Sequence, residues 1–222
     1  MAYTFSAGSS QYIRATAQSW GITAWPMTLF ARGKSSDLTN NQCVAAFIQE
    51  GSPYNGFLLL HAGAVAADPM NASSFGVVGV NSSVSYDDGG WHAFAQRRSS
   101  NTVFDINADG TTTAGGTTSV SFPNSPGAGG VNIGARLTPS FDLGLTGSAA
   151  AVAMWSVVLT DAEMNSLKAG FSPRRVRPQS LRFYAPLVRG LQVIAHKVTA
   201  GGAALTATNS PTVSDHPRSY GI

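Results

Sequence analysis

The side chains that could carry acid–base chemistry are few and scattered in this chain of 222 residues. Glycoside hydrolysis uses two carboxyl groups, one held protonated as the acid and one ionised as nucleophile or base. The sequence has only two glutamates: Glu50 lies among turn residues, and Glu163 lies where a helix is expected to begin. The aspartates do not repeat along one strand in a pattern that would supply the pair. We therefore expect no glycosidase activity and a protein that is not an enzyme.

Other catalytic and metal-binding motifs are also missing from the sequence. It has no Gly-x-Ser-x-Gly nucleophile elbow, no His-Glu-x-x-His zinc motif and no phosphate-binding loop. The single cysteine, Cys43, lies in an apolar stretch and is predicted to be a core residue. The histidines stand singly, so each is interpreted as a hydrogen-bonded structural residue; they are His61, His92, His196 and His216.

Binding surfaces are the chemistry that the sequence leaves open. Aromatic side chains in or near loops could stack on sugar rings, although such residues equally often cap a hydrophobic core. Arginines at positions 174, 175 and 177 could meet carboxylates on a partner, because guanidinium groups favour bidentate contacts. This run lacks the interleaved aromatics of nucleic-acid-binding segments, so we expect no nucleic acid. The loop aromatics are Trp20, Trp25, Tyr54 and Tyr86, and the arginines, the predicted partner-binding residues, are Arg174, Arg175 and Arg177.

Composition and charge limit the class of protein. Charged residues make up 11% of the chain, apolar residues make up 43%, and there are 24 glycines, which is typical of an all-β protein with many tight turns. Residues 168–222 hold eight basic residues and one acidic residue, whereas residues 1–167 hold six and ten. No run reaches the ~18 apolar residues of a membrane span, and the first ten residues lack the basic and apolar regions of a signal peptide. We expect a soluble protein without a membrane partner.

The stretch from Gly147 to Gly170 changes its hydrophobic pattern once, from a strand to a helix. Residues 150–159 are small, β-branched or aromatic and predict a buried strand. Thr160 and Glu163 then have the spacing of a capping box, in which each side chain accepts a hydrogen bond from the other residue's backbone N–H. Gly170 supplies the left-handed residue at which helices commonly end. We therefore predict one short helix near 160–169.

This stretch and several others resemble the concanavalin A-like (laminin-G/pentraxin-like) β-sandwich family. The resemblance implies an all-β jelly-roll sandwich of two antiparallel sheets, in which Trp91 and Trp155 are core anchors. It covers about residues 1–170, with residues 171–222 as a C-terminal extension of which 182–187 would pair with the N-terminal strands. The matching residues are Phe5, Tyr12 and Ile13; Gly90, Trp91 and His92; Asp109 and Gly110; Ile133 and Gly134; and Gly147, Val152, Met154, Trp155, residues 159–163 and Gly170.

The family resemblance also bears on cofactors and partners. Many relatives bind calcium through Asp and Asn oxygens, so calcium is the cofactor to weigh, at residues 87–88 or at Asn107 and Asp109, although both are explained as turns. No other cofactor or metal is expected.

The ending at residues 205–218 resembles tailed-bacteriophage structural proteins. This resemblance implies a virion protein, a homo-oligomer on the capsid or tail surface that contacts other virion proteins and is assembled in the host cytoplasm. The alternative is a lectin-like adhesin that binds host or environmental glycan, and a glycoside hydrolase is less favoured.

Overall fold

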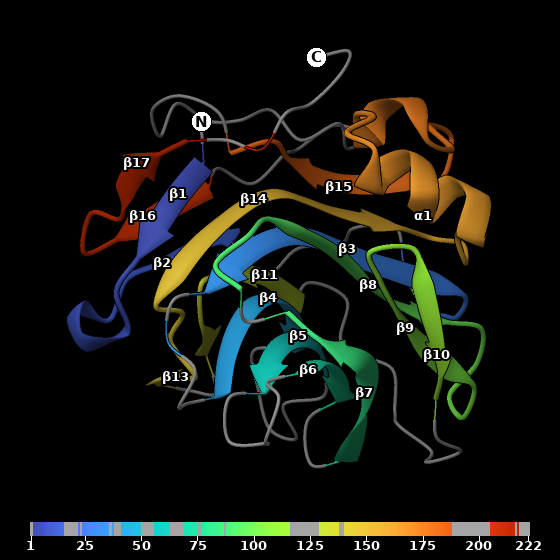
Figure 1. Ribbon diagram of the computed structural model, residues 1–222, viewed down its shortest axis with the longest axis horizontal. Helices are drawn as coiled ribbons and strands as arrows, with labels where there is room; N and C mark the ends of the chain where they lie inside the picture. The colour runs from blue at the N-terminus through green and yellow to red at the C-terminus, as the bar shows by residue number, and fades with distance from the viewer. Residues whose placement is uncertain are drawn as a thin grey trace.

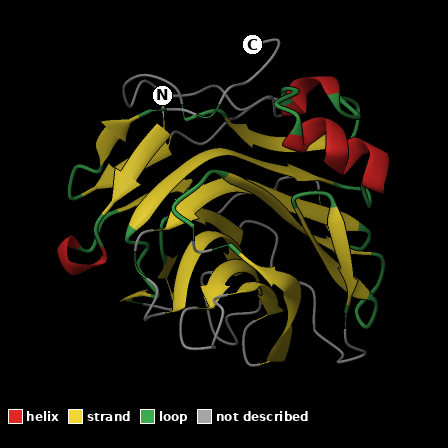
Figure 2. Cartoon of the chain, in the orientation of Figure 1, coloured by secondary structure: helices red, strands yellow, loops and turns green. Residues whose placement is uncertain are grey.

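The computed structural model describes residues 2–15, 22, 24–35, 37, 41–49, 56–62, 69–74, 77–86, 88–115, 129–137, 140–187, 205–215 and 217. The described chain is mostly antiparallel β-strand with one short α-helix, as the sequence predicts (Figures 1 and 2).

Two antiparallel sheets pack face to face and form a jelly-roll β-sandwich (Figure 1). Sheet A has the order β10 (Thr111–Ala114), β9 (Phe104–Ala108), β8 (His92–Arg98), β3 (Met27–Ser35), β14 (Gly147–Trp155), β1 (Ala2–Phe5) and β17 (Thr212–Ser214), with β15 (Leu181–Ala185) also paired to β14. Sheet B has the order β16 (Leu205–Thr208), β2 (Tyr12–Ala15), β11 (Gly129–Ile133), β4 (Asn41–Gln49), β5 (Gly56–Ala62), β6 (Pro69–Ser74) and β7 (Val77–Ser85). The short elements are β12 (Arg136–Leu137), β13 (Phe141–Asp142), the 3-10 helices η1 (Ala7–Ser9) and η2 (Pro173–Arg175), and α1 (Asp161–Lys168).

Alternation along the strands divides the apolar side chains between two layers. Leu29, Phe47 and Phe94 belong to the core between the sheets. Phe30 and Trp155 point to the opposite face of sheet A. There they pack with α1 and the segment that follows it, so this end of sheet A is buried on both faces (Figure 1). Cys43 is fully buried, as predicted, and burial raises the pKa of its thiol.

The predicted capping box begins α1. The hydroxyl of Thr160 accepts from the N–H of Glu163 at 3.3 Å, and a carboxylate oxygen of Glu163 accepts from the N–H of Thr160 at 2.7 Å. Met164 and Leu167 form the buried face, whereas Lys168 is exposed. Gly170 has a φ of +101°, a left-handed conformation that glycine adopts without strain.

The strands after residue 170 join both sheets, but in a different arrangement from the expected one. β15 pairs with β14 rather than with an N-terminal strand. The N-terminal strands are paired instead by the two last strands, β16 with β2 and β17 with β1. The expectation for residues 182–187 was wrong because β14 is long enough to pair with β1 along one half and with β15 along the other. A domain boundary at residue 170 stays a prediction.

Candidate functional site

A pocket of about 280 Å³ opens on the outer face of sheet A, next to the end of α1. β3 and β8 lie side by side there, and the turn between β9 and β10 closes one side. The residues that line it are Arg32, Trp91, His92, Ala93, Asp109, Lys168, Ala169 and Pro217; they are called the Trp91 pocket below.

His92 is held between two carboxylates at the edge of the Trp91 pocket. Its Nδ1 lies 2.7 Å from Asp109 Oδ2, and its Nε2 lies 2.8 Å from Asp88 Oδ1. The other oxygen of Asp109 accepts from the N–H of Ala93 at 2.8 Å. Asp109 is placed by the tight β9–β10 hairpin, where it and Gly110 have φ angles of +48° and +82°. The prediction that His92 is a hydrogen-bonded residue is confirmed, and its ring is fixed at both nitrogens.

The carboxylates set the charge of His92. Burial alone would lower the pKa of His92, but the hydrogen bonds to Asp109 and Asp88 outweigh it and raise the pKa above its usual value. Burial would raise the pKa of Asp109, yet the hydrogen bonds from His92 and Ala93 lower it overall. The hydrogen bond to His92 is likewise the largest cause of the lowered pKa of Asp88. Both negative charges are therefore balanced locally, by the imidazole and by backbone donors.

Two cations line the other side of the Trp91 pocket. Arg32, on β3, donates from Nη2 to the carbonyl oxygens of Leu167 and Lys168, the latter at 2.9 Å. A guanidinium at this position meets the negative end of the α1 dipole. Lys168 donates from Nζ to the backbone oxygen of Asp109 at 2.7 Å, which ties the helix to the β9–β10 hairpin. α1 thus holds both cations at the pocket.

Trp91 is half-buried and lines this pocket, so the expectation that it is a core anchor was wrong. The ammonium of Lys34 lies 5.4 Å from the centroid of its ring, a cation–π distance. The alternation of side chains along a strand could have predicted this outward position. Phe94 faces the core, and residue 91, three positions earlier, falls on the opposite face. Trp155, by contrast, is fully buried as predicted.

Of the four aromatic residues proposed as sugar platforms from the sequence, the two that the structure describes do not line the Trp91 pocket. Tyr86 is buried, donates from its hydroxyl to the Ala108 oxygen at 3.0 Å and packs edge-on against His92. Trp25 packs against the inter-sheet core, with the Arg98 guanidinium 5.4 Å from its ring centroid. Trp20 and Tyr54 lie outside the described residues.

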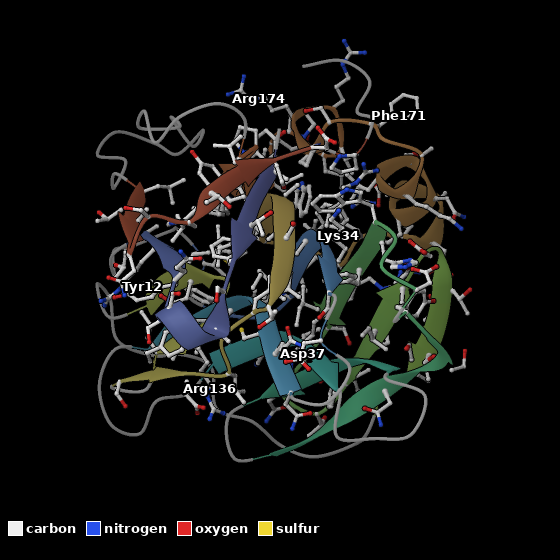
Figure 3. All side chains as sticks on the ribbon, turned by 60° about the vertical axis from the view of Figure 1, so that its left-hand side comes forward. Tyr12, Lys34, Asp37, Arg136, Phe171 and Arg174 are labelled. Atoms are coloured by element: carbon white, nitrogen blue, oxygen red, sulfur yellow. The ribbon has the colours of Figure 1, made fainter. Side chains whose placement is uncertain are left out.

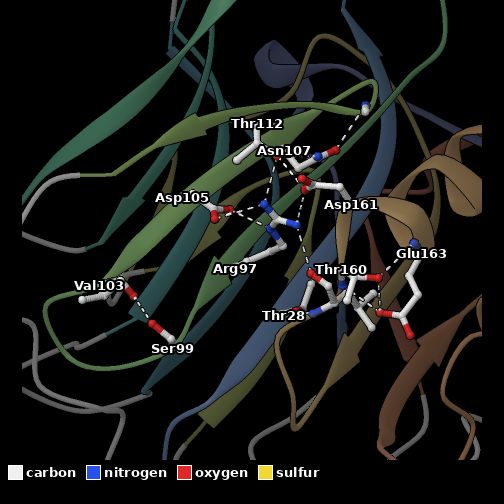
Figure 4. Close-up of polar contacts among 12 residues, drawn as sticks. Thr28, Arg97, Ser99, Val103, Asp105, Asn107, Thr112, Thr160, Asp161 and Glu163 are labelled. Atoms are coloured by element: carbon white, nitrogen blue, oxygen red, sulfur yellow. Dashed lines mark hydrogen bonds and ion pairs between the residues drawn. The ribbon is translucent and has the colours of Figure 1, made fainter.

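A separate polar network joins α1 to the edge of sheet A (Figure 4). Arg97 makes a bidentate ion pair with Asp105, at 2.7 and 3.0 Å, and donates to Asp161 at 2.7 Å. Thr112 on β10 accepts from Arg97 at 2.9 Å and donates to Asp161 at 2.8 Å. These two carboxylates are therefore engaged by one buried guanidinium, in a structural role.

The three arginines predicted to contact a partner are placed differently from one another. Arg174 is exposed on η2 (Figure 3), and so is Arg175. The Arg174 guanidinium lies 5.8 Å from the ring centroid of Tyr184. Arg177 is partly buried and ion-paired with Glu163 of the capping box. Their role in partner binding stays a prediction.

The oxygen clusters considered for calcium are engaged by protein groups where they are described. Asn107 donates to Thr112 and accepts from the N–H of Gly110, and Asp109 and Asp88 bind His92. Residue 87 lies outside the described residues. Within the described ranges, no three His, Cys, Asp or Glu side chains are arranged to hold a metal ion. No helix in the same ranges has the length and apolarity needed to span a bilayer.

Comparisons with known proteins support the fold, although the sequence identities are low. No protein-family model matches the chain, and no curated protein matches it in sequence. Among solved structures, it is similar to a Bacteroides ovatus protein considered to be carbohydrate-binding, with a TM-score of 0.64 and 18% identity over 96% of this chain and 61% of that one. The chain therefore spans about three fifths of that protein's length.

Two further neighbours are sugar-bound domains of larger enzymes. Domain 4 of an extracellular GH43 arabinanase from Geobacillus stearothermophilus, in complex with arabinotriose, has a TM-score of 0.53 and 16% identity over 68% of this chain and 70% of that one. The CBM40 domain of a Ruminococcus gnavus sialidase, bound to α2,3-sialyllactose, has a TM-score of 0.52 and 13% identity over 70% and 93%. At these identities the likeness concerns the fold, a β-sandwich shared with carbohydrate-binding domains.

Proposed function

We propose that this protein is a non-enzymatic carbohydrate-binding module that holds a glycan in the Trp91 pocket. The observation that carries the proposal is the half-buried Trp91 ring beside hydrogen-bonding groups that other contacts hold in place. An indole face stacks on the apolar face of a sugar ring, and fixed polar groups orient its hydroxyls. The three sandwich neighbours, each considered carbohydrate-binding or bound to a sugar, support the same class of ligand.

The polar groups of the Trp91 pocket suit recognition better than catalysis. Asp109 is already hydrogen-bonded to His92 and to a backbone N–H, so its carboxylate orients neighbours rather than awaiting a proton. Arg32 and Lys168 supply donors toward sugar oxygens while their other contacts hold them to α1 and the hairpin. This preorganisation lowers the cost of ordering side chains when a ligand binds.

The test is binding to a glycan panel that includes arabinotriose and sialyllactose, followed by calorimetry on the glycans that bind. Trp91→Ala is expected to weaken binding by about tenfold or more, equivalent to about 1.4 kcal/mol. Phe171→Ala is the matched control, because Phe171 is an exposed aromatic that does not line the pocket. If no glycan binds, or if Trp91→Ala binds as tightly as the wild type, the proposal is wrong.

The absence of enzymatic activity is tested on the same glycans. No reducing ends are expected to appear when the protein is incubated with a bound glycan. Release that a single Asp or Glu substitution abolishes would overturn this part of the proposal.

Display on a phage virion concerns where such a module acts, and it stays a prediction. The three structural neighbours reported above are described as carbohydrate-binding or sugar-bound, and none is described as a virion component. Mass spectrometry of purified particles from the source of this sequence would detect the chain if it is a virion component. Its absence from particles would remove the capsid or tail location while leaving glycan binding intact.

A further inference from the structure

A second pocket, of about 340 Å³, lies on the same face of sheet A beyond Lys34. We propose that it binds the anionic substituent, a carboxylate or a sulfate, of a neighbouring sugar in the same glycan. This inference rests on glycan binding in the Trp91 pocket. The lining residues are Thr4, Phe5, Lys34, Ser35, Gly89, Thr146, Gly147, Ser148 and Ser214; they are called the Lys34 pocket below.

The register of sheet A places the polar residues of the Lys34 pocket in one row. Thr4 on β1 lies opposite Ser148 on β14, and Ser148 lies opposite Lys34 on β3. β3 then pairs with β8, where Gly33 lies opposite His92, so the row continues toward Trp91. Figure 3 shows Lys34 beside β14. The Lys34 side chain therefore stands between the two pockets, with its ammonium over the Trp91 ring.

The hydroxyls in this pocket have a donor to spare. Thr4 Oγ1 and Ser148 Oγ lie 2.8 Å apart, and Ser214 donates to Ser148 at 3.4 Å. Three of the hydroxyls that line the pocket, those of Thr4, Ser148 and Ser214, carry three O–H donors, and these two contacts use two of them. Within the described part of the chain, the third O–H has no acceptor. A ligand oxygen in the pocket would accept a hydrogen bond from it, and the contacts with Thr4 and Ser214 hold the Ser148 side chain in place.

The charge of the pocket selects an anion. Among its described lining residues, Lys34 is the one charged group, and no carboxylate accompanies it. Across the described ranges, the Lys34 ammonium makes no ion pair with Asp or Glu. An ammonium and hydroxyl donors around an oxyanion form charge-assisted hydrogen bonds, which are shorter and stronger than neutral ones. A neutral hydroxyl of a sugar would use the same donors without this gain.

The experiment compares matched glycans that differ only in the anionic group. One pair is a sulfated oligosaccharide and its desulfated form; the other is oligogalacturonate and its methyl ester. For each protein variant, the measured quantity is the ratio of the two Kd values within a pair. The wild type is expected to prefer an anionic form by about tenfold, which is about 1.4 kcal/mol, and to lose the preference at high salt.

Lys34→Gln is expected to abolish this preference, Lys34→Arg to retain it, and Ser148→Ala to reduce it. Thr212→Ala is the control, since Thr212 is an exposed residue of the same cross-strand row that does not line the pocket. A preference within the sulfate pair alone or the carboxylate pair alone identifies the group that is bound. If Lys34→Gln weakens the binding of both glycans of a pair equally, Lys34 only supports the Trp91 ring and the proposal is wrong.

Failure of the proposed function is distinguishable from failure of this inference. If no glycan binds the wild type, titration with inorganic sulfate and acetate, followed by NMR of the Gly147 and Ser148 amides, tests the anion site alone. Saturable shifts that Lys34→Gln removes support the site, and the absence of shifts contradicts it.

Discussion

The indole Nε1 of Trp155 donates a hydrogen bond of 2.8 Å to the carbonyl oxygen of Val176. Trp155 ends β14, and Val176 follows η2, so this bond joins the sheet to the segment after α1. The Phe30 ring packs edge-on against the indole at a centroid distance of 6.3 Å. Trp155 therefore holds the segment after α1 against the outer face of sheet A in two ways, by apolar packing of its ring and by the hydrogen bond from its indole N–H.

Removing this side chain is expected to be costly. Trp155→Ala should lower the free energy of unfolding by about 3–5 kcal/mol, because it leaves a large cavity and an unpaired carbonyl. Trp91→Ala should cost much less, since that ring is half-buried. Denaturant unfolding of both variants measures the difference. Equal losses would show that the two tryptophans have similar structural roles.

The capping box makes a separate contribution. Thr160→Ala removes the side-chain oxygen that accepts from Glu163 and should destabilise the protein by about 1 kcal/mol. Thr160→Ser keeps that oxygen and should stay close to the wild type. Urea unfolding distinguishes the two, and a Thr160→Ala protein as stable as the wild type would contradict the role given to the cap.

The imidazole of His92 should titrate above the ordinary histidine pKa of about 6.5 when followed by NMR. Asp109→Asn should lower its pKa, because one of the two carboxylates is removed. Because the pKa of His92 is raised in the folded state, its contacts with Asp109 and Asp88 stabilise the fold fully below the unfolded-state pKa of His92. This stabilisation is lost as pH rises through the folded-state pKa.

The carboxylate of Asp109 behaves in the opposite sense. Its lowered pKa stabilises the fold above its unfolded-state pKa, and this contribution is lost as pH falls through the folded-state value. Stability from this contact should therefore be greatest between about pH 4 and 6.5. Stability measured from pH 3 to 9 checks this, with Asp109→Asn as the comparison. A wild-type profile identical to that of the variant would contradict it.

The arginines after α1 should differ in their effect on folding. Arg177→Glu loses an ion pair and places two negative charges together, so it should destabilise the protein by about 0.5–1 kcal/mol, since the pair is partly exposed. Arg175→Glu should leave stability unchanged because that side chain is exposed. Thermal unfolding measures both. If Arg175→Glu also reduces self-association or particle incorporation, the predicted partner surface is supported.

Local patterns predict much of this fold. The period change at residues 150–163 predicts both β14 and the capped α1, because strand alternation and capping depend on neighbouring residues. The pairing of β15 was not predictable in the same way. Which strand it joins depends on the length of β14 and on β17 occupying the edge of β1, and both are properties of the whole sheet.

The candidate site was harder to predict than the fold. The family resemblance places Trp91 in the core, although its position relative to Phe94 in the strand alternation predicts the outer face of sheet A. The lysines near Trp91 could not be found locally. Lys168 lines its pocket and Lys34 contacts its ring only through the packing of α1 on sheet A and the pairing of β3 with β8. Because only 11% of the residues are charged, charged side chains that gather around one aromatic ring indicate a candidate binding site.

The pairing of β1 with β17 also determines when the sandwich can be completed during synthesis. Tyr3 lies opposite Val213, so residues about 210 positions apart must meet to finish the edge of sheet A. β2 likewise pairs with β16 only after residues 205–208 have been synthesised. During translation, the first strands leave the ribosome long before their partners exist, and their unpaired edges are open to other chains. Pairing with β16 and β17 closes those edges once these strands have been synthesised.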